Sequence, residues 1–173
     1  MSAPGWRIRV ATDADRGKLA AFRCADPKVG WQLEVERFIQ NRLLDWAFEP
    51  RAAQDEPRVL LVLHKQTQDL VGVAAHERLM LRAPDATTFE GTKLEVIAVA
   101  VPWQGQLLGT TERASDVVMS AAMTDIRARV PPRSPRIVAS VHEENVRSLA
   151  LCRRHGFTTD LERVDPAYRR LVA

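Results

Sequence analysis

The chain has 173 residues, of which 46% are hydrophobic and 27% are charged. This length and balance are typical of one globular domain with its own core, and they exclude a disordered chain. The two cysteines are too few for a disulfide framework and lack the spacing of a zinc site, so we expect no metal. No apolar run approaches the roughly 18 residues that cross a bilayer, and the first residues do not resemble a secretion signal. We expect a single domain over residues 1–173, cytoplasmic and without a membrane partner.

The formal net charge of +3 is unevenly distributed, because residues 127–173 contain ten Arg against five Asp and Glu. A basic C-terminal third could attract a phosphate-rich ligand. It shows no basic helix face and no patch of interleaved basic and aromatic residues, so nucleic acid is not expected as the main partner. The sequence is also compatible with a homodimer.

Hydrophobic periodicity predicts the elements of the first half of the chain. Thr12 and Asp13 form an N-cap signal, and Leu60 to Leu63 belong to a dense apolar run that is typical of a strand covered on both faces. In chain order we predict a strand over Trp6–Ala11, helices over Asp15–Phe22 and Trp31–Phe48, and a hairpin of strands over Arg58–His64 and Leu70–Leu81.

In the second half, Pro131 and Pro132 end a long helix, and Gly156 occupies the position after a helix where a left-handed residue is favoured. The predicted elements are a strand over Phe89–Val101, a helix over Gly105–Arg129, a strand over Arg136–Val141, a helix over Asn145–His155 and a strand over Phe157–Val164, followed by a basic tail with Tyr168. The mixture predicts an α/β or α+β domain with a central mixed sheet.

A strand that ends in a glycine-containing turn before a helix is a weak signal for phosphate binding. Helix N-termini leave backbone N–H groups unpaired and carry a partial positive charge, so they can bind a diphosphate. The strand over residues 94–101 runs into Gly105 and Gly109 before the predicted long helix. Most such turns are only connections, so this segment by itself does not establish a site.

Two segments together resemble the GNAT superfamily of N-acetyltransferases. Residues 97–99 and 104–109 are similar to its motif A, whose turn is R/Q-x-x-G-x-G/A. Gln104 fits the first position and Gly109 the last, but Leu107 stands where the middle Gly is usual. The stronger match is to motif B, N-x-x-A/S-x-x-L-Y-x-x-x-G-F, in which the residues in register are Asn145, Ser148, Leu151, Gly156 and Phe157.

The resemblance implies an acetyl-CoA-dependent N-acetyltransferase with a mixed, mostly antiparallel sheet of six to seven strands flanked by about four helices. It implies that N–H groups from Gln106 to Gly109 hold the coenzyme diphosphate, and that the backbone of Ile97 and Val99 pairs with the pantetheine arm. Asn145 could contact the coenzyme directly or serve as a helix N-cap, and one residue could do both. Arg147, Arg153 and Arg154 could face the phosphates or simply cover a solvated helix face. The implied coenzyme-binding residues are Ile97, Val99, Gln104, Gly105, Gln106, Leu107, Leu108, Gly109, Asn145, Ser148 and Cys152.

The predicted chemistry needs a base for the amine and an acid for the leaving thiolate. Glu95 is the candidate base, because alternation puts it on the same sheet face as Val99; a salt-bridged strand residue is the plain alternative. Cys152 stands where the family usually has a Tyr acid, and either it or Tyr168 could take that role, although a buried apolar Cys is common. His76 and His142 are weaker candidate bases.

The acceptor amine is expected to be chosen by residues 24–48 and 82–92. Trp31, Glu34, Glu36 and Trp46 could form an acidic, aromatic pocket for a cation, or merely a core stripe and a solvated face. Two other functions stay open. The departures at Leu107 and Cys152 would suit a non-catalytic acyl-CoA-binding regulatory module, and the basic C-terminal third would permit a toxin-type acetyltransferase acting on aminoacyl-tRNA.

Overall fold

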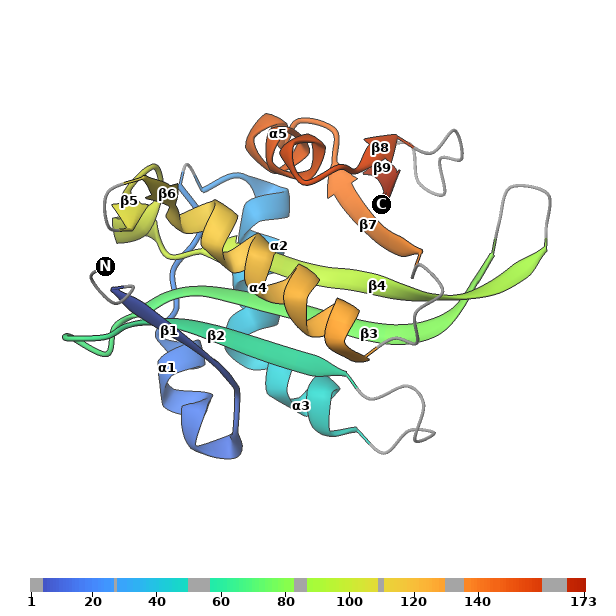
Figure 1. Ribbon diagram of the computed structural model, residues 1–173. Helices are drawn as coiled ribbons and strands as arrows, with labels where there is room; N and C mark the ends of the chain where they lie inside the picture. The colour runs from blue at the N-terminus through green and yellow to red at the C-terminus, as the bar shows by residue number, and fades with distance from the viewer. Residues whose placement is uncertain are drawn as a thin grey trace.

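A seven-stranded mixed sheet forms the centre of the molecule, which we analysed as a computed structural model (Figure 1). The structure describes residues 5–26, 28–49, 57–82, 87–108, 111–129, 136–159 and 168–173. Within these residues the strand order is β1-β2-β3-β4-β7-β9-β8, and β5 and β6 form a separate hairpin. The strands are β1 (Trp6–Val10), β2 (Arg58–His64), β3 (Leu70–Arg82), β4 (Thr88–Val99), β5 (Leu107–Leu108), β6 (Glu112–Arg113), β7 (Ile137–His142), β8 (Thr158–Thr159) and β9 (Tyr168–Val172).

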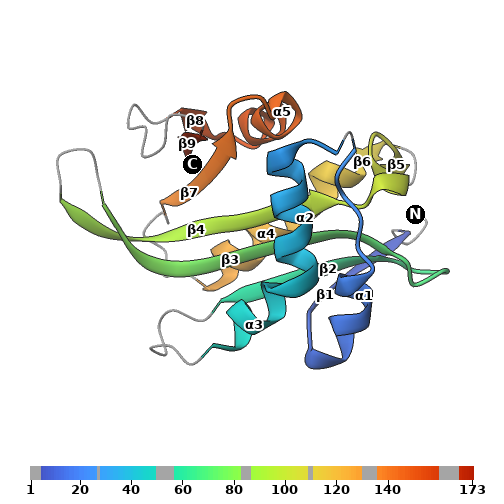
Figure 2. The same ribbon diagram turned by 180° about the vertical axis from the view of Figure 1, so that it is seen from behind.

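Helices cover both faces of the sheet. Helices α1 (Arg16–Ala20), α2 (Gly30–Asn41) and α3 (Leu43–Phe48) pack on one face, and α4 (Ala114–Arg129) and α5 (Val146–Arg154) pack on the other (Figures 1 and 2). Each face has its own hydrophobic cluster, one around Val118 and Met119 of α4 and one around Ile39 and Leu43 of α2 and α3. This two-sided burial explains the apolar run in β2, whose residues contribute alternately to the two clusters.

The predicted mixed, mostly antiparallel sheet of six to seven strands is confirmed: only β4 and β7 run parallel among the described pairs. The sheet is flanked by five α-helices in the described residues, against about four predicted. None of these helices is long and apolar enough to cross a membrane.

Three element predictions were wrong in detail. The single helix predicted over Trp31–Phe48 is two helices, because Arg42 has a non-helical φ of −129°. The break lets Leu43 and Leu44 both bury against the sheet. The predicted basic tail is strand β9, which closes the sheet beside β7. Of the strand predicted over Phe157–Val164, only β8 lies in the described residues. Helix α4 also begins later than predicted; this third error affects the site and is described below.

Helix α4 lies close to β3 at Gly72. A Cβ atom at this position would press against Cγ2 of Val118 and would lie 2.8 Å from the carbonyl oxygen of Ala98. Neither neighbour is the flexible end of a long side chain, so the backbone or the helix would have to move. The absence of a side chain at Gly72 therefore sets the distance between α4 and the sheet.

Replacing Gly72 by Ala should lower the free energy of unfolding by about 1–3 kcal/mol, because the added methyl group overpacks the contact with α4. Chemical denaturation measures this change. Gly17→Ala in α1 is the matched control, because a Cβ there has no heavy atom within 4 Å, and it should be neutral or stabilising. Equal losses for the two variants would contradict the close approach.

A partly buried cluster of His76, Asp125 and Arg58 connects the C-terminal part of α4 to the sheet. Nε2 of His76 lies 2.9 Å from Oδ2 of Asp125, and Oδ1 of Asp125 lies 3.1 Å from Nη2 of Arg58. Burial lowers the pKa of His76, outweighing the attraction of the Asp125 carboxylate, and the charges of Arg58 and Arg129 act in the same direction as burial. The folded protein therefore favours neutral His76, with its Nε2 proton donated to Asp125.

This shift predicts weaker folding at acid pH. The unfolded chain takes up a proton at His76 near pH 6.5 and the folded chain resists it, so the free energy of unfolding should fall as the pH drops below about 6.5, by at most about 1.4 kcal/mol per unit for one proton. His76→Gln, which retains an N–H donor but does not titrate, should flatten this part of the stability profile. A His76→Gln profile as steep as that of the wild type, measured by denaturation from pH 7 to 5, would contradict the assignment.

Candidate functional site

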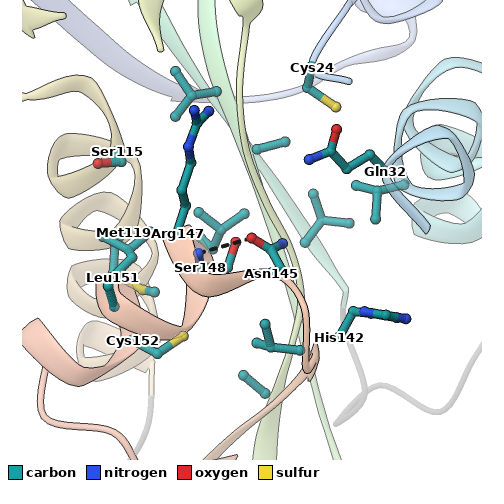
Figure 3. Close-up of a pocket in the computed structure, with 18 of the residues that line it drawn as sticks. Cys24, Gln32, Ser115, Met119, His142, Asn145, Arg147, Ser148, Leu151 and Cys152 are labelled. Carbon is teal, nitrogen blue, oxygen red and sulfur yellow. Dashed lines mark hydrogen bonds between the residues drawn. The ribbon is translucent and has the colours of Figure 1, made fainter. Parts of the chain in front are cut away.

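The two parallel strands in the middle of the sheet pair briefly and then separate. Only Thr92, Lys93 and Leu94 of β4 pair with β7, although β4 continues to Val99 and β7 to His142. A pocket of about 580 Å³ lies in the V between them and is lined by both strands and by residues of α2, α4 and α5 (Figure 3). The described residues therefore leave an open strand edge facing a pocket in the centre of the fold.

A β-bulge at Glu95 determines which residues of β4 face this opening. Leu94 pairs with His76 of β3 and Val96 pairs with Ala75, so Glu95 is the extra residue. Beyond the bulge, the N–H of Ala100 bonds to β3 at Val71, and alternation then directs the backbone groups of Ile97 and Val99 to the open edge. These are the two residues whose backbone the sequence predicted to pair with pantetheine.

Gln104 has a structural role in addition to its place in the pocket wall. Its amide nitrogen donates to the carbonyl oxygens of Val99, at 3.0 Å, and of Cys24, at 2.8 Å. The side chain thus ties the end of β4 to the segment that precedes α2. It also occupies one of the backbone acceptors on the open edge. Gly105 beside it has a φ of +74°, a left-handed conformation that favours glycine.

The turn after Gly105 differs from the prediction. The helix expected to begin at Gly105 begins at Ala114, and before it Leu107–Leu108 and Glu112–Arg113 form the short antiparallel strands β5 and β6. Gln106 donates its N–H to the carbonyl of Trp103, and Leu107 and Leu108 pair with Arg113 and Glu112. Leu107 and Leu108 are extended, so no helix begins at this point. The row of unpaired helix N–H groups that was predicted to hold the diphosphate is therefore not present at Gln106 to Leu108. Gly109 lies outside the described residues.

Helix α5 begins with a side-chain cap that also reaches the pocket. Oδ1 of Asn145 accepts the N–H of Ser148 at 3.1 Å, which satisfies one of the unpaired donors of the first turn (Figure 3). Both residues line the pocket. Asn145 is therefore confirmed as the N-cap of α5, and the cap lies in the pocket wall.

Both cysteines line the pocket, from opposite walls (Figure 3). Burial raises the pKa of Cys152, on α5, to about 11. Burial and the nearby Glu36 carboxylate raise the pKa of Cys24 to about 12. Each thiol therefore stays protonated at neutral pH, so neither cysteine is suited to act as a nucleophile.

The candidate bases occupy different places. Glu95 lines the pocket at the bulge, and its carboxylate lies 2.6 Å from the ammonium group of Lys93. His76 is not in the pocket wall, because it belongs to the cluster with Asp125 on α4. His142 lines the pocket, and its Nδ1 lies 3.3 Å from the N–H of Glu144. The backbone of Tyr168 pairs with His142, which brings it beside the V; its side chain lies outside the described atoms.

The wall formed by α2 is aromatic and polar. Trp31 stacks on His142 with ring centroids 5.2 Å apart and planes 14° from parallel, and Gln32 and Asp26 line the same wall. The other members of the predicted cation pocket lie elsewhere. Trp46 packs edge-on against Phe38, Glu34 is exposed, and the buried Glu36 carboxylate accepts the N–H groups of Cys24 and Ala25.

Charge is segregated across the pocket. Arg113, Arg147 and Arg154 line it on the side of α4 and α5, and Asp26 lines it on the side of α2. Arg154 is paired with Asp116 in the first turn of α4, at 3.0 Å, and His155 contacts the same carboxylate at 3.1 Å. Burial opposes ionisation of Asp116, but these two partners hold its pKa below the ordinary value. One half of the pocket is thus suited to an anion and the other to a cation.

Several residues of the pocket wall were not found from the sequence: Leu94, Arg113, Ser115, Met119 and Ala139. Arg113 and Ser115 were placed inside a long helix because the hydrophobic positions 107 and 108 fit its period. Gly109 followed by two Thr residues, which favour extended structure, was the available signal against that helix. In the described part of the chain, no group of three or more His, Cys, Asp or Glu residues could hold a metal ion.

No protein-family model and no curated protein matches the sequence. Solved structures do match the fold. A mutant AtaT toxin bound to the C-terminus of the antitoxin AtaR and acetyl-CoA has a TM-score of 0.69 at 13% identity, covering 98% of this chain and 92% of that one. PaiA N-acetyltransferase from Thermoplasma acidophilum in complex with coenzyme A has a TM-score of 0.66 at 13% identity, with 99% and 98% covered. The GNAT domain of S. lividans PAT has a TM-score of 0.65 at 15% identity, with 97% and 89% covered.

These matched structures are of acetyltransferases and toxins, and each matches nearly the whole of this chain. The chain therefore has the fold of the GNAT acetyltransferases over nearly its whole length. The resemblance seen in residues 94–157 is confirmed at the level of the fold.

The raised thiol pKa values predict slow alkylation of the folded protein. At pH 7.5 the thiolate fraction of Cys152 and Cys24 should be so low that both react with iodoacetamide at least about a hundredfold more slowly than a free cysteine. In denaturant both should react at the ordinary rate, which serves as the control. Rapid labelling of Cys152 in the folded state, detected by peptide mass spectrometry, would contradict the buried, protonated thiol.

Proposed function

We propose that the protein is an acetyl-CoA-dependent N-acetyltransferase that transfers an acetyl group to a primary amine. The observation that carries the proposal is the early separation of β4 from β7, which leaves the backbone of Ile97 and Val99 facing a pocket with a basic and an acidic side. An open strand edge can pair with the amide groups of pantetheine as it would with another strand. The proteins of the same fold that contain acetyl-CoA or coenzyme A agree with this reading.

The coenzyme would enter along the α4 and α5 side. Arg147 and Ser115 line this side near the N-terminal end of α4, and Met119, Leu151 and Cys152 provide apolar or weakly polar surface further in (Figure 3). This order suits a molecule with an anionic end and a less polar arm. The N–H of Val99 then faces the region where the thioester oxygen would lie and could polarise it.

The amine would enter from the α2 side. The Trp31–His142 stack and the Asp26 carboxylate form this wall, and an ammonium group is attracted to both carboxylates and aromatic faces. Glu95, at the bulge, is the proposed base that removes the proton from the ammonium group. Its ion pair with Lys93 orients the carboxylate, and because the side chain of Glu95 is only 17% exposed, bulk water has limited access to it.

The amine nitrogen then attacks the thioester carbon, the carbon–sulfur bond breaks, and the coenzyme thiolate takes up a proton. Cys152 is the proposed donor, because its thiol is protonated at neutral pH and lies in the pocket wall. Tyr168 is the alternative donor from the neighbouring strand. The nitrogen of the new amide then loses its excess proton, which restores the thiol of Cys152, and Glu95 releases to solvent the proton that it took from the ammonium group.

The fold does not favour a toxin over another acetyltransferase. The AtaT toxin and PaiA N-acetyltransferase match it about equally, with TM-scores of 0.69 and 0.66. No contact of the described residues points to aminoacyl-tRNA. A non-catalytic acyl-CoA-binding module is distinguished from the enzyme by turnover.

The test is acetyl-CoA binding by calorimetry together with thiol release in the presence of a panel of primary amines. The wild type should bind acetyl-CoA and release thiol with at least one amine. Glu95→Gln should lower kcat/KM about a hundredfold or more while coenzyme affinity is retained, because general-base catalysis contributes about 10²–10⁴. Coenzyme binding with no turnover on any amine would support the regulatory module instead.

Matched variants separate the individual roles. Glu90→Gln lies on the same strand, outside the pocket wall, and should leave turnover unchanged. Of Cys152→Ala and Tyr168→Phe, the variant that removes the acid should lower kcat and flatten the alkaline side of its pH profile. Retention of full activity by Glu95→Gln would contradict the proposed base.

A further inference from the structure

We propose that the amine acceptor carries an amide group beside its primary amine, and that Trp31 and Gln32 at the start of α2 recognise this amide. The inference rests on the transferase function proposed above and adds the chemical class of the acceptor. It depends on two buried polar atoms of the α2 wall that have no hydrogen-bond partner in the described part of the chain.

Two adjacent residues carry the unpaired atoms. Among the pocket-lining residues that the structure describes, Nε1 of Trp31 and Oε1 of Gln32 are the buried side-chain atoms that lack a hydrogen-bond partner. Most buried polar atoms in proteins are paired, because an unpaired one has lost its bonds to water without gaining others. Here one atom is a donor and the other an acceptor. A ligand that supplies one acceptor and one donor would therefore satisfy both.

Stacking holds the donor in place. The indole ring of Trp31 lies against His142 with ring centroids 5.2 Å apart and planes 14° from parallel. Nδ1 of His142 in turn accepts the N–H of Glu144 at 3.3 Å. An indole N–H lies in the plane of its ring, so the stack also fixes the direction in which Trp31 donates. Because this nitrogen can only donate, its partner must be an acceptor such as a carbonyl oxygen.

The acceptor atom is at the end of a side chain that reaches the pocket. In Figure 3 the Gln32 side chain extends from α2 into the pocket, with its amide on the side of Cys24. The last torsion of a glutamine side chain has broad minima, so this amide can turn its oxygen toward the pocket. The backbone donors nearby are already used, since the carboxylate of Glu36 accepts the N–H groups of Cys24 and Ala25. The oxygen of Gln32 is thus left for a ligand.

An amide supplies both partners at once. Its carbonyl oxygen can accept from Trp31 while its N–H donates to Gln32. An ester, the linkage in aminoacyl-tRNA, has the carbonyl but no N–H, so it would leave the oxygen of Gln32 unpaired. The carboxylate of Asp26 in the same wall can attract the ammonium group of the acceptor. This wall therefore suits a peptide or an amino-acid amide better than an aminoacyl ester or an alkylamine.

The experiment measures kcat/KM for three acceptors with the wild type, Gln32→Leu and Trp31→Phe. The acceptors are alanine N-methylamide, alanine methyl ester and the alkylamine of the same length. For each acceptor, the ratio of variant to wild type cancels the different intrinsic reactivities of the amines. Gln32→Leu should lower this ratio about 5- to 150-fold further for the amide than for the ester, because only the amide loses a bond. Trp31→Phe, which retains a ring against His142, should lower it further for the amide and the ester than for the alkylamine.

A matched control and a second readout separate recognition from structure. Glu34→Leu places the same new side chain at an exposed position of α2 outside the pocket wall, and it should affect the three acceptors alike. Gln32→Leu removes a buried oxygen that has no partner among the described residues, so its melting temperature should equal or exceed that of the wild type.

Other outcomes overturn the inference. Equal losses for all three acceptors in both variants would show that the two side chains do not read an amide. A lower melting temperature of Gln32→Leu would show that its oxygen supports the fold. Transfer by the wild type to the alkylamine but not to the amide would contradict this inference and leave the proposed function standing. The absence of transfer to any amine would contradict the proposed function itself.

Discussion

The site depends on the brief parallel pairing of β4 and β7. Three residue pairs hold the strands together, and the bulge at Glu95 comes directly after them. If the pairing continued, the edge of β4 would be saturated and no ligand could use it. If the bulge were absent, alternation would turn Val96 and Ala98 to the opening in place of Ile97 and Val99. The same short stretch thus opens the pocket, selects its backbone groups and places a carboxylate at its inner end.

Contacts at both ends of α4 keep one wall of this opening in place. Gly72 lets the helix lie directly on β3, and the His76–Asp125–Arg58 cluster fixes its C-terminal part. Asp116 joins its first turn to α5. On the other side, Gln104 and Glu36 both bond to the backbone near Cys24, which connects β4 to α2. The pocket is therefore bounded by elements that are each tied to the sheet, as a preorganised site requires.

The sequence could predict the features that depend on local pattern. The apolar run of β2, the capped helix beginning after Asn145 and the strand of β4 all follow from periodicity and cap chemistry, which act over a few residues. Residues of the motif at 145–157 have local roles that the sequence can express: Gly156 follows α5 with a φ of +86°, and Leu151 and Phe157 are buried. The Asn145 cap of this motif is present as expected.

Features that depend on distant partners could not be predicted. The β5–β6 hairpin replaces a helical turn because extended Leu107 and Leu108 find partners in Glu112 and Arg113, and Leu108 is then buried against α4 and the sheet. The bulge at Glu95 arises from the register with β3, which the sequence of β4 does not encode by itself. Strand β9 is a basic segment whose burial beside β7, including that of Arg170, is supplied entirely by the fold.

The two halves of the pocket are built from different parts of the chain, and this bears on what the protein can recognise. The proposed coenzyme half is formed by α4, α5 and the open edge of β4. The proposed acceptor half is formed by α2 and the loop before it, where Trp31 stacks on His142 of β7. The contact joins α2 to the end of β7. A substitution in α2 that moves Trp31 would therefore also change the position of His142. In the proposed function, the Trp31–His142 stack and the charge of Asp26 would select the amine, and the side of the pocket formed by α4 and α5 would hold the coenzyme.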